Sequence, residues 1–194
     1  MKTVVATLQS ISPYSQGRHY VEDKKQGENP RDHEARTWRG RMHVNDEGFV
    51  YIPPMAFKNS LSEAAKFLGI TIPGKGKATF TKHFEAGVLV IDPLILPIKA
   101  EDVTGQWLFV PSDGVRGSGK RVDKCFPVIP EWSGDVTFHV MDETLFTKIA
   151  TPEGTMTAFE WHLRQAGTFI GLGVFRPRNN GFYGRFSVQK ITGI

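Results

Sequence analysis

The sequence predicts an α+β protein whose ferredoxin-like core follows the order β-α-β-β-α-β and carries a long inserted arm and basic loops. Three observations support this prediction. The 194 residues suit a single domain. Hydrophobic residues make up 40% of the chain and include 14 Phe and 4 Trp, enough for a packed core. Strand-like and helix-like segments follow one another in that order. We therefore expect one domain, 1–194, with insertions at about 12–48, 70–85 and 112–124.

The first third of the chain predicts a strand, an arm, a second strand and a helix. The β-branched run from Thr3 to Ile11 predicts the first strand. Residues 12–48 show no hydrophobic period, so we expect a long polar excursion there, with Tyr14, Tyr20 and Trp38 as its large anchors. After a short strand over 49–52, the capping-box pattern Ser60–Glu63 predicts a helix that ends at Gly69.

The remainder predicts mostly strands, with one more helix. Residues 70–85 are rich in Gly and Lys and predict a basic hairpin or loop. The apolar run 87–98 predicts strand structure, and its two prolines indicate either an edge strand or a break between two strands. Further strands are expected over 106–110 and 135–141, with a glycine-rich basic loop over 113–124 between them. Thr157–Glu160 is a second capping box that opens a helix reaching Gly167, and the last strand is expected over 182–191.

The composition narrows the class of protein. The chain holds 24 Lys and Arg against 20 Asp and Glu, a net charge of +4, which permits a polyanionic partner. The single cysteine, Cys125, excludes an internal disulfide and a thiolate-rich zinc site, and its apolar surroundings indicate packing rather than reactivity. We find no secretory-type apolar segment and no run of 18 apolar residues, so we expect a cytoplasmic protein without a membrane partner.

Motifs for catalysis and for cofactors are weak. Gly114–Lys120 has the spacing of a phosphate-binding loop, but Arg121 stands where such a loop needs Ser or Thr, and a strand rather than a helix is expected behind it. The six histidines show no helical pair, and the densest set of potential ligands, Asp32–Glu34, lies in the charged arm. The sequence therefore predicts no metal, no cofactor and no catalytic residue.

The C-terminal segment carries the clearest functional pattern. From Trp161 onward there is no Asp or Glu, and arginines alternate with aromatic residues among glycines. Arginine can bind phosphates, aromatic rings can stack on bases, and glycine lets a backbone come close, which together favour single-stranded nucleic acid. We expect Phe169 and Phe186 to be core residues, whereas the turn that holds Arg176, Arg178 and Tyr183 is a candidate contact.

Basic residues recur in the arm and in the two other loops, whereas residues 131–160 are acidic. This separation of charge also suits head-to-tail self-association into a homo-oligomer. The candidate nucleic-acid-binding residues from these segments and the C-terminal segment are Arg36, Arg39, Arg41, Lys75, Lys77, Lys82, Arg116, Lys120, Arg121, Arg176, Arg178, Tyr183 and Arg185.

Two segments resemble a known superfamily, the repeat-associated mysterious proteins. Ile52–Ala65 resembles the segment that leads into the family's first helix, and Gly167–Phe186 resembles its glycine-rich loop and last strand. The resemblance implies a ferredoxin-like fold of the RNA-recognition type, as in the CRISPR backbone subunits that polymerise along guide RNA. It implies that Lys58 and 176–178 touch the nucleic-acid backbone and that 12–48 is a palm-edge or thumb insertion. The chain is also similar to compact bacteriophage proteins, which would act in the host cytoplasm.

The leading hypothesis is a non-enzymatic protein that binds single-stranded RNA or DNA mainly through the backbone, with aromatic stacking on bases. Two alternatives remain open. One is a phage structural or interaction protein that engages a host protein. The other is a metal-independent ribonuclease of the same superfamily, in which a histidine such as His33 or His43 would take part in proton transfer.

Overall fold

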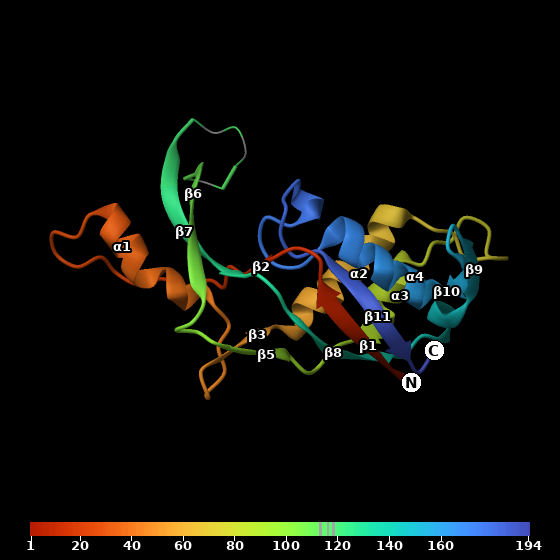
Figure 1. The fold of residues 1–194 in the computed structure, drawn as a ribbon. Helices are drawn as coiled ribbons and strands as arrows, with labels where there is room; N and C mark the ends of the chain where they lie inside the picture. The colour runs from red at the N-terminus through yellow and green to blue at the C-terminus, as the bar shows by residue number, and fades with distance from the viewer. Residues whose placement is uncertain (113, 116, 118) are drawn as a thin grey trace.

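The computed structural model describes residues 1–112, 114, 115, 117 and 119–194, and it is an α+β structure with antiparallel sheets (Figure 1). The largest sheet has the strand order β11-β1-β8-β4, and each neighbouring pair is antiparallel. Helices α2 and α3 precede β4 in the chain, and α4 lies between β8 and β11. The bounds are β1 Lys2–Ser10, α2 Pro54–Leu68, α3 Thr81–Gly87, β4 Val88–Leu89, β8 Ser133–Val140, α4 Ala158–Gln165 and β11 Phe186–Thr192.

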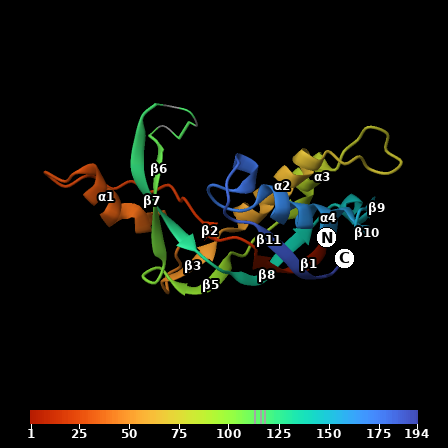
Figure 2. The same cartoon turned by 45° about the horizontal axis from the view of Figure 1, so that its top comes forward.

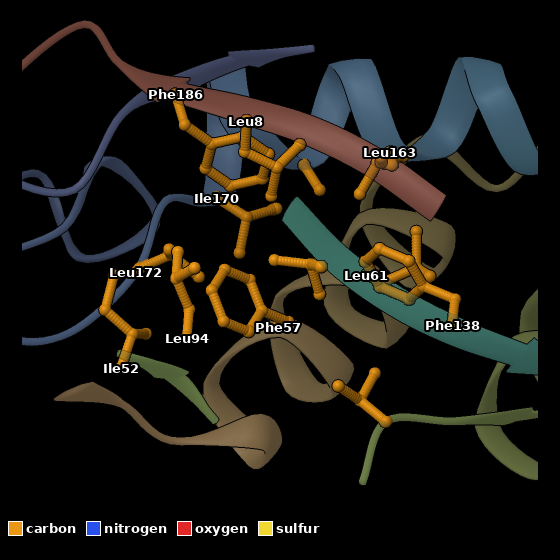
Figure 3. Close-up of a cluster of buried hydrophobic side chains, with 14 of the residues drawn as sticks. Leu8, Ile52, Phe57, Leu61, Leu94, Phe138, Leu163, Ile170, Leu172 and Phe186 are labelled. Carbon is orange, nitrogen blue, oxygen red and sulfur yellow. The ribbon is translucent and has the colours of Figure 1, made fainter. Parts of the chain in front are cut away.

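One face of this sheet is packed and the other is open. Val4, Ala6 and Leu8 alternate along β1 and are completely buried, as the period of two in a strand requires when one face meets a core. In Figure 3, Leu8 of β1 and Phe138 of β8 point toward side chains of the helices. The opposite face carries small and polar side chains, and Thr7 donates a hydrogen bond of 2.6 Å to Asp135 there.

The rest of the chain builds a second region beside this sheet. A three-stranded sheet has the order β2-β7-β6, in which β6 and β7 form a long hairpin, and two short helices pack on β7. Figures 1 and 2 show the hairpin and α1 at one end of the molecule, while the two termini lie close together at the other. The bounds are β2 Tyr14–Ser15, α1 Pro30–Thr37, η1 Trp38–Arg41, β6 Thr104–Pro111 and β7 Arg121–Ile129.

Two small two-stranded sheets complete the fold. β3 (Phe49–Ile52) pairs with β5 (Leu94–Lys99), and β9 (Lys148–Thr151) pairs with β10 (Gly154–Thr157). The apolar run 87–98 is divided at Pro93, which lies between β4 and β5, whereas Pro97 lies within β5. The β9–β10 hairpin was not expected from the sequence. None of the helices that the structure describes combines the length and the hydropathy needed to cross a membrane.

Residues 12–48, where the sequence shows no hydrophobic period, contain regular structure: β2, α1 and η1. Helix α1 begins after Asn29, whose side chain accepts hydrogen bonds from the backbone N–H groups of Arg31 and Asp32 at 3.0 and 2.9 Å. Pro30 occupies the first helical position, where its missing N–H is harmless. The helix buries only Glu34 and Thr37, so it has no apolar stripe from which a sequence pattern could reveal it.

Two helix boundaries differ from the prediction. α2 begins at Pro54 rather than at Ser60, which is a buried residue inside the helix, so the pattern Ser60–Glu63 is not a cap. The predicted end at Gly69 is confirmed, since this glycine takes the left-handed conformation that helix ends favour. Residues 81–85, expected as part of a basic hairpin or loop, belong to α3, and the last strand begins at 186 instead of 182.

The second capping box is confirmed. The Thr157 hydroxyl accepts the backbone N–H of Glu160 at 3.1 Å and starts α4. The helix continues as a π-helical turn, η3 (Ala166–Ile170), beyond the predicted end at Gly167. This turn directs Phe169 outward, so the expectation that Phe169 is a core residue is wrong, whereas Phe186 is buried as expected.

A histidine lies in the centre of the helical layer. His162 on α4 is completely buried between the rings of Phe80 and Phe84, at centroid distances of 5.6 and 4.5 Å. Its Nδ1 lies 2.6 Å from the carbonyl oxygen of Ala158, whereas Nε2 has no hydrogen-bond partner among the described residues. Burial lowers the pKa of this imidazole from 6.5 to about 4, so the folded protein holds it neutral.

We therefore expect acid to destabilise the fold through His162. The unfolded chain binds this proton near 6.5 and the folded chain only near 4, so the stability present above 6.5 is lost as the pH falls between these values. The expected decrease in the free energy of unfolding is about 2 kcal/mol between roughly pH 7 and pH 5. Urea unfolding of wild type and His162→Leu at both pH values measures it.

His19→Leu provides the matched control, because His19 is exposed. Between roughly pH 7 and pH 5, the free energy of unfolding of this variant should fall as much as that of wild type. In His162→Leu the fall should be smaller by about 2 kcal/mol. An equal pH dependence in wild type and His162→Leu would contradict the assignment.

Candidate nucleic-acid interface

A groove lies between the β6–β7 hairpin and the glycine-rich segment 171–185. Figures 1 and 2 show this segment, in blue, between the hairpin and α2. Two adjoining hollows of about 700 and 370 Å³ share part of their lining, including Val110, Phe126 and Phe175. We call this feature the hairpin groove, and its charged and aromatic lining residues are Arg41, Arg121, Lys124, Phe126, Phe175 and Arg176.

Close packing of backbone on backbone shapes the wall formed by 171–185. Gly173 lies so near β2 that a Cβ there would come within 2.0 Å of the Ser15 carbonyl oxygen, and its φ of 74° is one that L side chains disfavour. A Cβ on Gly184 would come within 2.0 Å of the Leu172 carbonyl oxygen. We expected these glycines to make room for a nucleic-acid backbone. At both positions the neighbouring backbone belongs to the protein itself.

The folded-back segment presents one aromatic ring to the groove. Phe175 has a φ of 51°, which is uncommon for a residue with a side chain and costs about 1–2 kcal/mol. Its carbonyl oxygen accepts the backbone N–H of Tyr183 at 3.0 Å, which helps to hold this conformation. The Phe175 ring meets Phe126 of β7 edge to face, with centroids 4.8 Å apart. The two walls of the groove thus meet through aromatic rings.

A buried carboxylate fixes the opposite wall. Glu34 on α1 is 2% exposed and accepts the backbone N–H of Cys125 and the ammonium of Lys124, both at 2.9 Å. The Arg41 guanidinium also pairs with Glu34 and donates to the Cys125 carbonyl oxygen at 2.8 Å. Burial alone would raise the pKa of Glu34, but these hydrogen bonds outweigh it and lower the pKa to about 2.

The groove keeps an excess of positive charge. Arg41 and Lys124 share the single negative charge of Glu34, so this cluster carries a net charge of about +1. Arg121 donates to the Phe109 carbonyl oxygen at 2.6 Å and lies over the Phe109 ring, and it forms no ion pair with a described residue. Arg176, by contrast, is neutralised by Glu63 of α2 at 2.8 Å.

Several of the predicted cations have partners within the protein. Arg36 pairs with Glu22 and Glu28 inside the arm, and the Arg39 guanidinium lies 4.3 Å from the centroid of the Trp38 ring. Lys58 donates to Ser62 and to two backbone carbonyl oxygens of α3, at 2.6 to 3.0 Å. Burial lowers the pKa of Lys58. These contacts hold α1 and α3 in place.

The remaining predicted residues are dispersed. Lys75 and Lys77 lie in the loop before α3, which Figures 1 and 2 place at the opposite end of the molecule from the hairpin, and Lys82 lies on α3. Lys120 is exposed beside the start of β7, whereas Arg116 falls outside the described residues.

The other three candidates of the C-terminal segment do not line the groove. Arg178 lies over Phe67 and Arg185 donates to the Thr168 carbonyl oxygen at 3.3 Å. Tyr183 is nearly buried, and its hydroxyl is hydrogen-bonded to Gln106 of β6. Tyr183 thereby joins the glycine-rich segment to the base of the hairpin.

Lys124, Phe126 and Phe175 were not among the sequence candidates. Phe126 and Lys124 occupy alternate positions on β7, on the same face of the strand, and β6–β7 pairing places them opposite Gln106 and Leu108. The available signals were the position of Lys124 at the end of the basic loop and of Phe175 directly before the candidate Arg176. Neither signal indicates which side of a strand or turn faces a groove.

The histidines proposed for a ribonuclease lie apart from the groove lining. His33 has its Nε2 2.7 Å from the Glu22 carbonyl oxygen, and His43 packs against Tyr51 with ring centroids 5.5 Å apart. Burial, followed by the nearby Arg18 charge, lowers the pKa of His43. Cys125 is buried, and burial followed by the Glu34 charge raises the pKa of its thiol. Among the described residues no three His, Cys, Asp or Glu side chains gather into a metal-binding cluster.

Comparison with known proteins shows a distant likeness to solved structures. No protein-family model matches the chain, and no curated protein sequence does. Among solved structures, the chain is similar to the crystal structure of Cmr6 from Pyrococcus furiosus, with a TM-score of 0.45 and 14% sequence identity over 96% of this chain and 97% of that chain. At this similarity the likeness assigns neither a family nor a function.

Glu34→Gln should destabilise the protein. The amide cannot compensate Arg41 and Lys124, so we expect the free energy of unfolding to fall by about 3 kcal/mol at neutral pH, measured by urea unfolding. Because folding lowers the pKa of Glu34 from 4.5 to about 2, its contribution is present above 4.5 and is lost as the pH falls toward 2. The variant should therefore lose part of this acid sensitivity.

Glu22→Gln is the matched control, since Glu22 also pairs with an arginine of the arm but is far more exposed. This change should cost less than about 1 kcal/mol. Equal losses in the two variants would show that the burial of Glu34 has no special role.

Proposed function

We propose that this protein binds single-stranded RNA or DNA along the hairpin groove, without acting as an enzyme. The observation that supports this most directly is the composition of the groove. The cations Arg121, Lys124 and Arg41 face it together with the rings of Phe126 and Phe175. Cations in excess of carboxylates attract phosphates, and aromatic side chains provide surfaces for bases that are not paired in a duplex.

Each group has a distinct role in this proposal. Arg121 and Lys124 contact phosphates, because their charges are not fully compensated within the protein. Arg41 is held by Glu34 and mainly positions β7. Phe109 on β6 is 59% exposed and, with the Arg121 guanidinium above its ring, offers a further stacking surface at the outer edge of the hairpin. The contacts are to backbone and base faces, so little sequence preference is expected.

We also infer that the four-stranded sheet with α2 and α4 is a ferredoxin-like core. The strands β1, β4, β8 and β11 with the helices between them follow the order β-α-β-β-α-β, and the first and third strands are central in the sheet. The segments that resemble the repeat-associated mysterious proteins form the start of α2 and the glycine-rich segment before β11. In this interpretation the arm 12–48 is an insertion that supports the hairpin.

Self-association along the strand is a further part of the proposal. Glu131, Asp135, Glu143 and Glu153 are exposed, and they belong to the part of the chain that contains β8, β9 and β10. A basic groove on one copy and an acidic surface on the next suit head-to-tail contact. Size-exclusion chromatography with oligonucleotides of increasing length should then give complexes that grow in steps.

Fluorescence-anisotropy titration of labelled single-stranded RNA and DNA tests the groove. Arg121→Ala combined with Lys124→Ala should weaken binding about tenfold, because two charged hydrogen bonds to phosphates are lost. The slope of log K against log salt should also become shallower by about 1.4 for two lost contacts with a single strand. The loss should be similar for different base sequences.

Lys75→Ala combined with Lys77→Ala is the control. It also removes two positive charges, but from the loop at the opposite end of the molecule, so the change in net charge is matched. Its affinity should stay within about twofold of wild type. If the control loses as much affinity as the groove variant, the groove is not the binding site. If wild type binds no oligonucleotide at low salt, the proposed function is wrong and a protein partner becomes the alternative.

A further inference from the structure

Two exposed aromatic rings form a pair on the far side of the glycine-rich segment from the hairpin. Phe67 lies in the last turn of α2 and Phe169 in the π-helical turn η3. Their ring centroids are 5.6 Å apart with an angle of 38° between the planes. Phe67 is 52% exposed and Phe169 is 45% exposed, so both rings present half of their surface to solvent. We call this feature the phenylalanine pair.

Positive charge surrounds the pair. The Arg178 guanidinium lies 5.8 Å from the centroid of the Phe67 ring, within the range of a cation–π contact. Arg185 donates to the carbonyl oxygen of Thr168, the residue next to Phe169. Neither arginine forms an ion pair with a described residue, and the chain holds no carboxylate side chain after Glu160.

The carboxylates on the neighbouring helices already have partners. Glu63 on α2 pairs with Arg176, and Glu85 on α3 pairs with Lys66. The field around the phenylalanine pair is therefore positive, and an anionic ligand is favoured there over a neutral or cationic one.

The pair also lies next to the hairpin groove. The short helix η4 (Pro177–Asn179) separates them, with Arg176 and Asn179 lining the groove and Arg178 lying over Phe67. A three-residue 3₁₀ turn is only about 6 Å long. A strand that leaves the groove across this turn would meet the phenylalanine pair within a short distance.

We propose that the phenylalanine pair is a second stacking site, which takes an unpaired base of the same strand while Arg178 and Arg185 contact its phosphates. This inference rests on the proposed function and extends it beyond the groove. Two rings flanked by arginines match one base with its phosphate in size and charge. They provide far less apolar area than a stable protein interface requires, which is why a nucleic acid is the favoured partner.

A double-mutant cycle between protein and oligonucleotide tests the stacking directly. Phe67→Leu combined with Phe169→Leu keeps apolar bulk but removes both aromatic faces. Binding of a single strand of about twelve nucleotides should weaken about tenfold, as expected for loss of base stacking. The salt slope should stay at the wild-type value, because no phosphate contact is lost.

The second arm of the cycle uses strands in which abasic sites replace successive nucleotides. At one position the abasic site should weaken wild-type binding about tenfold and leave the affinity of the leucine variant unchanged. Leu89→Ala is the control, since Leu89 is similarly exposed but lies on β4, at the edge of the sheet opposite β11. Its affinity should equal that of wild type.

The outcomes separate this inference from the proposed function. Absence of binding by wild type overturns both. Wild-type affinity in the leucine variant overturns the stacking site but leaves the groove in place. Equal loss of affinity at every abasic position in wild type and variant overturns the stacking site as well, because the rings would then act only through the protein structure.

Discussion

The hairpin groove depends on the hydrogen bonds of one buried group, the Glu34 carboxylate. It joins α1 to β7 across 91 positions of sequence by accepting the Cys125 N–H, and the same two oxygens receive Arg41 and Lys124. A buried carboxylate is stable only if hydrogen bonds replace its lost hydration, so these partners are required rather than optional. The arm, the hairpin and the cationic wall of the groove are therefore held by one group.

The opposite wall of the groove, formed by residues 171–185, is shaped by close backbone packing. The segment 171–185 folds back on β2 and on itself so closely that Gly173 and Gly184 leave no room for a side chain. This packing fixes Phe175 in an unfavourable backbone conformation, and its ring then meets Phe126 on the first wall. Strain of this kind persists only where the surrounding structure determines the geometry, and it is frequent at binding sites.

Local signals made part of this structure predictable. The β-branched run of β1, the helix end at Gly69 and the Thr157 cap depend on residues a few positions apart, and sequence patterns indicate them correctly. The sequence does not reveal helix α1, because the helix has no apolar stripe and its buried Glu34 contacts a strand far along the chain. In the site, Arg41, Arg121 and Arg176 were expected. Lys124, Phe126 and Phe175 were not, because hairpin pairing and the folded-back segment decide which side chains face the groove.

The predicted cations differ in whether the protein itself supplies partners for their charge. Arg36, Lys58 and Arg176 are hydrogen-bonded to carboxylates or backbone carbonyl oxygens of the protein. To bind a phosphate, such a cation must first give up these bonds, which costs free energy. Arg121, Arg178 and Arg185 contact only rings or carbonyl oxygens among the described residues, so their charge remains available. These three lie beside the two aromatic surfaces on either side of η4, and we therefore propose that turn as the crossing point for a bound strand.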